Sequence, residues 1–191
     1  MKFRLTAFIV AVAGIAVATS CGDPTAIKAQ FPTGDDTLEV FALNGTPGTL
    51  PSAVDTRRGV AVRVSSSFTF DVAWDINAAG EAVAITPRMV GNELTGARRV
   101  GLLLAAPPFE GILKAPTGGY KYDSLMVVPL DKILLVDALD PSCSAFSILG
   151  QNIRSKIQVD SVIPSRKAIY LRIVSNPNCG FRDLGPGIPK E

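Results

Sequence analysis

Asp71 and Asp75 form the only close pair of carboxylates on a strongly predicted strand, which covers residues 68–76. Glycosidases use paired carboxylates to protonate a leaving group and to activate water, at separations of about 5 to 9.5 Å. Four residues along one strand place these two side chains roughly 13 Å apart. We therefore interpret them as solvated charges on the water-facing side of a half-buried strand.

Other catalytic arrangements lack essential parts. The 191 residues include no histidine, which excludes imidazole-activated nucleophiles and imidazole-ligated metals. No serine stands in a G-x-S-x-G pattern or three residues before a lysine. Asp75 and Asn77 resemble the start of a calcium loop, but Ala79 supplies no side-chain oxygen and Thr86 stands where a bidentate Glu is needed. We expect no enzyme, no cofactor and no metal site.

Three aromatic residues are candidates for contact with a ligand or partner. Phe109, Tyr120 and Tyr122 fall in a central region rich in Gly and Pro, where exposed rings could stack on a sugar or insert into a partner surface. The alternative is that Tyr122 points inward from a strand and Phe109 plugs one end of the core. We favour this alternative, because most aromatic residues of a small β domain are buried.

Short strands must position these residues. Alternating apolar residues and the turn signals between them predict strands at residues 37–43, 59–64, 68–76, 81–90, 99–105, 122–128, 132–139, 155–163 and 167–175. A helical turn is expected only at residues 143–152, and Pro87 is expected at an edge or bulge. The pattern predicts an all-β fold, an antiparallel β-sandwich or small barrel of about eight or nine strands.

The strand at residues 68–76 is the clearest of these predictions. Phe68, Phe70, Val72, Trp74 and Ile76 alternate along it and are expected on one face, toward the core. The intervening residues are expected to face water. The strand is therefore expected at the centre of the fold.

The first twenty residues are typical of an export signal. A short basic start precedes fourteen uncharged residues, 5–18, too few to span a bilayer, which needs about 20. The small residues 18–20 followed by Cys21 resemble the lipobox of bacterial lipoproteins, although Ala18 stands where Leu is usual. Residues 16–18 also fit an A-x-A cleavage site, which would release a soluble chain beginning at Thr19.

The lipoprotein resemblance implies that Cys21 carries a lipid and anchors the chain to a membrane. Gly22, rather than Asp, follows it, which by the same resemblance implies sorting to an outer membrane, with the protein facing the periplasm or the surface. The export segment holds two of the 19 basic residues and none of the 17 acidic ones, so the mature chain has 17 of each. This balance argues against a nucleic-acid partner.

Cys143 and Cys179 are expected to form a disulfide. If Cys21 carries a lipid, these two are the remaining pair in an exported protein, where no cytosolic reductant keeps thiols apart. The expected organisation is a signal peptide at 1–20, a lipidated N-terminus and flexible tether at 21–36, a single β domain at 37–183 and an irregular tail at 184–191.

These observations predict a non-enzymatic, lipid-anchored protein of the cell envelope, with a structural or binding role toward an envelope protein or a glycan. The alternative is an extracytoplasmic carbohydrate-binding module that uses the rings of Phe109, Tyr120 and Tyr122 as its platform. A hydrolase that uses carboxylates is a third hypothesis, and it requires two acidic side chains that converge in a cleft.

Overall fold

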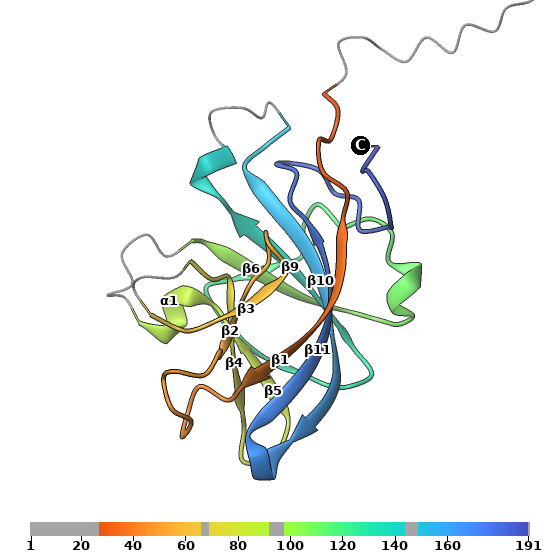
Figure 1. Ribbon diagram of the computed structural model, residues 1–191. Coiled ribbons are helices and arrows are strands. Elements are labelled where there is room, and N and C mark those ends of the chain that lie inside the picture. The colour runs from red at the N-terminus through yellow and green to blue at the C-terminus, as the bar shows by residue number, and fades with distance from the viewer. Residues whose placement is uncertain (1–26, 66–68, 92–97, 144–148, 191) are drawn as a thin grey trace, which may run out of the picture.

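The computed structural model describes residues 27–65, 69–91, 98–143 and 149–190. Two antiparallel sheets form a β-sandwich (Figure 1). The six-stranded sheet has the order β1 (Gly34–Phe41), β11 (Ala168–Asn176), β10 (Asn152–Ile163), β9 (Ile133–Leu139), β6 (Val100–Ala105) and β7 (Lys121–Tyr122). The five-stranded sheet has the order β3 (Val60–Val62), β2 (Ala53–Asp55), β4 (Val72–Ile76), β5 (Ala82–Ile85) and β8 (Leu125–Val128). The predicted all-β sandwich is confirmed, with eleven strands among the described residues.

Helices are short in the described residues. They are α1 (Pro87–Val90) and three 3-10 turns, η1 (Phe109–Gly111), η2 (Pro141–Cys143) and η3 (Pro164–Arg166). None of them is long or apolar enough to cross a membrane. The helical turn expected at residues 143–152 is not found in the described part of that range. The 3-10 turn η2 ends at Cys143, and strand β10 begins at Asn152.

The inner core lies between the two sheets. Trp74 of β4 is fully buried there, among apolar residues of both sheets such as Leu102, Leu134 and Leu171. The expectation that Val72, Trp74 and Ile76 share a core-facing side is confirmed, although Ile76 is only partly buried. Phe68 lies outside the described residues.

The opposite side of this strand does not face water as expected. Ala73 packs with Ala53 and Phe70 in a separate buried cluster, so Phe70 lies on the side opposite to its predicted one. Asp71 is also completely buried. The period-two pattern located the strand but not the segments that cover its second face.

The six-stranded sheet carries a further apolar layer on its outer face. Ile133 and Leu135 of β9 point away from the inner core and pack beneath Phe109, Ala115 and Leu184. The covering segments are a loop that contains η1 and the C-terminal tail, which bond to each other through Ala115 N–H to Arg182 O and Leu184 N–H to Leu113 O. Figure 1 shows η1 in green and the tail in blue on the same side of β10 and β11.

Several element boundaries differ from the prediction. The strand predicted at 122–128 is two strands in different sheets, with Asp123 in a left-handed conformation (φ 50°) between them. Pro87 begins α1 rather than an edge strand, because its fixed φ suits the first turn of a helix. The short strand β2 was not predicted.

The hairpin and disulfide predictions are confirmed. Pro164–Arg166 forms the turn between β10 and β11, and Cys143 is bonded to Cys179 with a Cα–Cα distance of 5.5 Å. In the β4–β5 hairpin, the side chain of Asn77 accepts hydrogen bonds from the backbone N–H groups of Ala79 and Glu81. These bonds give Asn77 the role of a turn residue.

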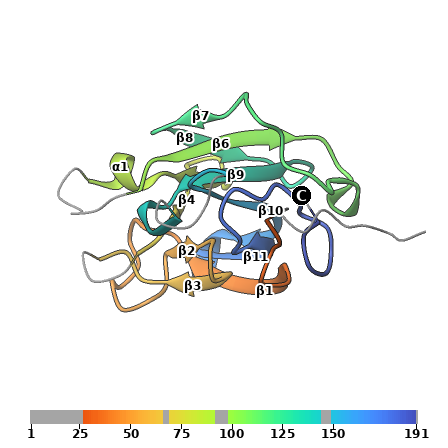
Figure 2. The same ribbon diagram turned by 90° about the horizontal axis from the view of Figure 1, so that it is seen from above.

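The expected tether is shorter than predicted. Strand β1 begins at Gly34, and the backbone N–H groups of Gln30 and Phe31 donate to Oδ1 of Asn178 at 2.8 and 3.0 Å. Thr33 forms a β-bridge with Gly187 of the tail. The chain is therefore fastened to the domain from Gln30 onward. Viewed from above, Figure 2 shows the start of β1 and the C-terminal segment on the same side of the sandwich.

Candidate ligand-binding groove

The floor of a groove is formed by the outer face of the six-stranded sheet. Register places Lys156 of β10 beside Val174 of β11, and Val174 beside Asp35 of β1, in one cross-strand row. Arg172 lies two residues along β11 from Val174, so its side chain projects from the same face. Strand geometry thus brings together polar groups that are far apart in the sequence.

The walls are supplied by the two covering segments. Phe109, Glu110 and Leu113 come from η1 and the residues after it, and Leu184 and Pro186 come from the tail. The space between them is about 360 Å³. This is within the range of about 300 to 1,000 Å³ that small-molecule sites occupy. Half of the ten lining residues are apolar and four are charged.

Lys156 is the buried charged group of the groove, with 3% of its surface exposed. Its ammonium donates hydrogen bonds to the backbone oxygens of Phe109 and Ile112 at 2.8 and 2.9 Å and lies 4.5 Å from the centre of the Phe109 ring. No carboxylate of the described residues lies within ion-pair distance of it. Burial lowers the pKa of Lys156, because it disfavours the charged form.

Arg172 lies at the mouth of the groove and is already neutralised. Its guanidinium pairs with Asp35 at 2.9 Å and with Glu110 at 2.6 Å, and it lies 4.6 Å from the centre of the Phe109 ring. The hydrogen bond from Arg172 lowers the pKa of Glu110. Both acidic groups at the groove are therefore hydrogen-bonded to Arg172, and Lys156 has no direct carboxylate partner among the described residues.

Phe109 is the only one of the three predicted contact residues that belongs to this groove. Its ring is buried, as the alternative interpretation expected, and packs over Ile133 and Leu135. Lys156 and Arg172 were not identified from the sequence, because strand alternation assigns them to a solvent-facing side. The uninterrupted apolar run at residues 133–136 is the signal that would have found the covered outer face, since strands buried on both faces lose their alternation.

Tyr120 and Tyr122 lie elsewhere and do not form an exposed platform with Phe109. Tyr120 is partly buried against the outer-face cluster, and burial raises its pKa. The hydroxyl of Tyr122 donates to Asp137 at 2.7 Å, and burial together with this bond raises the pKa of Tyr122 to about 12. Arg99 lies 4.3 Å from the centre of the Tyr122 ring. Both tyrosines are thus held within the domain.

A second polar region joins strand ends at one end of the sandwich. Asp71 accepts hydrogen bonds from the backbone N–H and hydroxyl of Thr56 at 2.8 and 2.7 Å, and from Arg98 at 3.0 Å. Arg98 also pairs with Asp140 at 3.5 Å, and Arg57 pairs with Asp140 at 2.8 Å. We call Thr56, Arg57, Asp71, Arg98 and Asp140 the arginine–carboxylate cluster.

Charge pairing in this cluster opposes the effect of burial. Burial raises the pKa of Asp71 even though Arg98 and Thr56 favour its charged form. Burial would also raise the pKa of Asp140, but hydrogen bonds from Ser142 and the positive charge of Arg98 bring it below its usual value. The interpretation of Asp71 as a solvated charge is therefore wrong: it is a fully buried ion-pair partner that ties β4 to the segment before β6.

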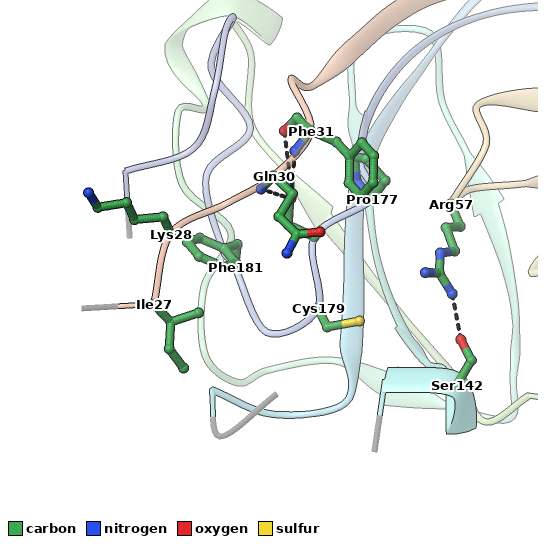
Figure 3. Close-up of a pocket in the computed structure, with 10 residues that line it drawn as sticks. Ile27, Lys28, Gln30, Phe31, Arg57, Ser142, Pro177, Cys179 and Phe181 are labelled. Carbon is green, nitrogen blue, oxygen red and sulfur yellow. Dashed lines mark hydrogen bonds between the residues drawn. The ribbon is translucent and has the colours of Figure 1, made fainter. Parts of the chain in front are cut away.

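A hollow of about 390 Å³ lies beside this cluster, at the end of the domain where the described chain begins (Figure 3). Arg57 and Ser142 are hydrogen-bonded on one side of it, and Gln30, Phe31 and Cys179 lie on the other. Its lining includes Ile27, the first described residue. We take the outer-face groove, which is lined by residues from η1, the tail and three strands of one sheet, as the candidate site.

Comparison of the chain with protein-family models, with curated proteins and with solved structures finds no match.

Proposed function

We propose that this chain is an exported, lipid-anchored protein of the cell envelope whose β-sandwich binds a ligand or partner and is not catalytic. The use of the three cysteines carries the proposal. Cys143 and Cys179 are joined in a disulfide, which leaves Cys21 as the one cysteine outside it. Cys21 stands at the end of an apolar export segment in a lipobox-like context, where acylation consumes its thiol.

The attachment point limits how far the domain can stand from the membrane. The chain is fastened to the domain from Gln30, nine residues after Cys21. At no more than about 3.3 to 3.6 Å per residue, these nine residues span at most about 30 Å. The end of the domain that carries the disulfide and the C-terminal tail would therefore face the lipid surface, with the outer-face groove beside that end.

A binding role is supported by the groove, and a structural role is supported for the buried carboxylates. Asp71 and Asp140 are held by arginines and hydroxyl groups, an arrangement that stabilises a fold. The groove combines an apolar lining with a buried ammonium that lacks a carboxylate partner. The carbohydrate alternative has less support, because Phe109 is buried and Tyr122 is bonded to Asp137.

Intact mass of the protein extracted from membranes tests the anchor. We expect a chain that begins at Cys21 and carries acyl groups, and a Cys21→Ser variant that leaves the membrane fraction. Cys143→Ser is the matched control, because it removes a cysteine without removing the acylation site, and it is expected to stay membrane-bound. A wild-type chain that begins at Thr19 without acyl mass would refute the anchored function.

A further inference from the structure

We propose that the outer-face groove binds the anion of an amphipathic carboxylic acid, with the carboxylate at Lys156 and the alkyl chain along the apolar lining. The inference rests on the proposed function, which makes the domain a binding module, and it names the ligand class. It has two independent parts, the charge of the head group and the path of the chain.

The head group follows from the buried ammonium of Lys156, which has no direct carboxylate partner among the described residues. A buried ammonium is costly unless it is paired, and two backbone carbonyls satisfy only two of the three donors of Lys156. The nearby carboxylates, Asp35 and Glu110, are held by Arg172. A ligand carboxylate would supply both a counter-charge and an acceptor for the third donor. A cationic head group would have to compete with Arg172 for Asp35 and Glu110.

The alkyl chain follows from the shape of the lining. The groove adjoins a neighbouring hollow of about 290 Å³, with which it shares the lining residues Leu113 and Pro186. Leu113 and Ile188, which line it, expose 57% and 60% of their surface to solvent. Adjacent exposed apolar side chains of this size mark binding surfaces, and an alkyl chain that lies on them would remove them from water.

Titration with three ligands of equal chain length tests the head group. The protein is the full chain with Cys21→Ser, and the ligands are decanoate, decan-1-ol and decyltrimethylammonium, each below its micelle concentration. We expect decanoate to bind about tenfold or more tightly than decan-1-ol, because its bond to Lys156 is charge-assisted. Decyltrimethylammonium should bind most weakly.

Lys156→Met is the decisive variant, because it keeps the length and apolar stem of the side chain. We expect it to abolish the preference for decanoate over decan-1-ol while both still bind. Lys132→Met, at an exposed lysine in the turn before β9, should keep the preference. Near-UV circular dichroism shows whether each variant is folded. An unchanged preference in folded Lys156→Met, or no saturable binding of decanoate to the parent chain, would overturn the proposal.

A second variant tests the proposed position of the ligand's alkyl chain without replacing a buried residue. Leu113→Asn should weaken decanoate binding, whereas Leu130→Asn, at a leucine of similar exposure that does not line the groove, should not. Octanoate should bind more weakly than decanoate by about fourfold for each methylene removed. Equal affinities for octanoate and decanoate would also refute the claim that the ligand's alkyl chain lies along the apolar lining. The titrations use the Cys21→Ser chain, which has no lipid anchor, so they are independent of the intact-mass measurement. If the titrations fail, the proposed anchor is unaffected. If the wild-type chain is found without acyl groups, the proposed ligand is unaffected.

Discussion

Two regions of this domain bury charge, and they treat it differently. In the arginine–carboxylate cluster, the buried carboxylate of Asp71 is bonded to Thr56 and Arg98. In the outer-face groove, Lys156 is almost as buried, yet its hydrogen-bond partners among the described residues are two backbone carbonyls. The first region pairs its buried charge directly with an arginine, and the second leaves an ammonium without a direct carboxylate partner beside an open groove.

This difference separates the roles of the two regions. A buried ion pair that is complete within the protein holds strand ends in place, and removal of one partner leaves a costly isolated charge. A buried ammonium beside a solvent-accessible groove can still gain a partner from outside. Burial of a charged residue is therefore not by itself a sign of a binding site, and what matters is whether the protein has already supplied the opposite charge.

The largest expected effect comes from the disulfide that fastens the end with the cluster. Replacement of both Cys143 and Cys179 by Ser removes a cross-link between residues 36 positions apart. On the chain-entropy model this lowers the free energy of unfolding by about 4 kcal/mol. Denaturant unfolding measures the change. A loss below about 1 kcal/mol would show that the cluster holds this end without the cross-link.

Removal of the cation from the cluster should be the next largest effect. Arg98→Met leaves Asp71 buried without its ion-pair partner, and we expect a loss of about 3 kcal/mol at neutral pH, since Thr56 still donates two bonds. Arg166→Met is the control. It removes an ion pair with Glu39 in which the two side chains are 59% and 36% exposed, and it should change stability little.

The pH dependence of Arg98→Met sharpens this comparison. Burial raises the pKa of Asp71 above its unfolded value, so the folded state binds the proton more tightly. Stability contributed by this group is therefore lost as the pH rises above about 3.9 and through the folded pKa. Loss of Arg98 raises that pKa further and should steepen the decline. An identical pH profile in the variant and the wild type would contradict the ion-pair role of Arg98.

The smallest expected effect concerns Lys156, and it is a change in how the free energy of unfolding varies with pH. Burial lowers the pKa of Lys156 below its unfolded value of about 10.4, so the folded state releases the proton first. Wild-type stability should therefore rise as the pH increases from the folded pKa toward about 10.4, and Lys156→Met should lack this rise. Unfolding measured at neutral pH and at about pH 10 tests it, with Lys132→Met as the control. Parallel profiles for wild type and Lys156→Met would show that Lys156 is not held as a buried ammonium.

Much of the fold was predictable because it depends on local pattern. Alternating residues in β10 and β11, with Pro164 in the turn between them, define a hairpin without reference to the rest of the chain. The cysteine count, with the expectation of export, was enough to predict the pairing of Cys143 with Cys179. By contrast, β2 has only three residues, and its pairing with β3 and β4 depends on contacts beyond its own segment.

The candidate groove was not predictable in the same way. Phe109 was singled out as an aromatic residue in a region rich in Gly and Pro, but no prediction was made for its neighbours Lys156 and Arg172, which alternate with apolar residues in their strands. Their environment depends on the loop around η1 and on the tail, which cover one face of the sheet. A pattern read along one strand carries no information about an irregular segment that returns to cover it.

The sequence by itself determined the strands of the two sheets in outline, the strongest hairpins, the disulfide and the expected route of export, because each follows from neighbouring residues or from counts of a residue type. Only the tertiary structure decided which polar groups are buried and whether they are paired. Asp71 and Lys156 look alike in the sequence, as charged residues of amphipathic strands. Arg98 reaches one of them, and no carboxylate in the part of the chain that the structure describes reaches the other, because charge pairing is set by distances across the fold and not by position along the chain.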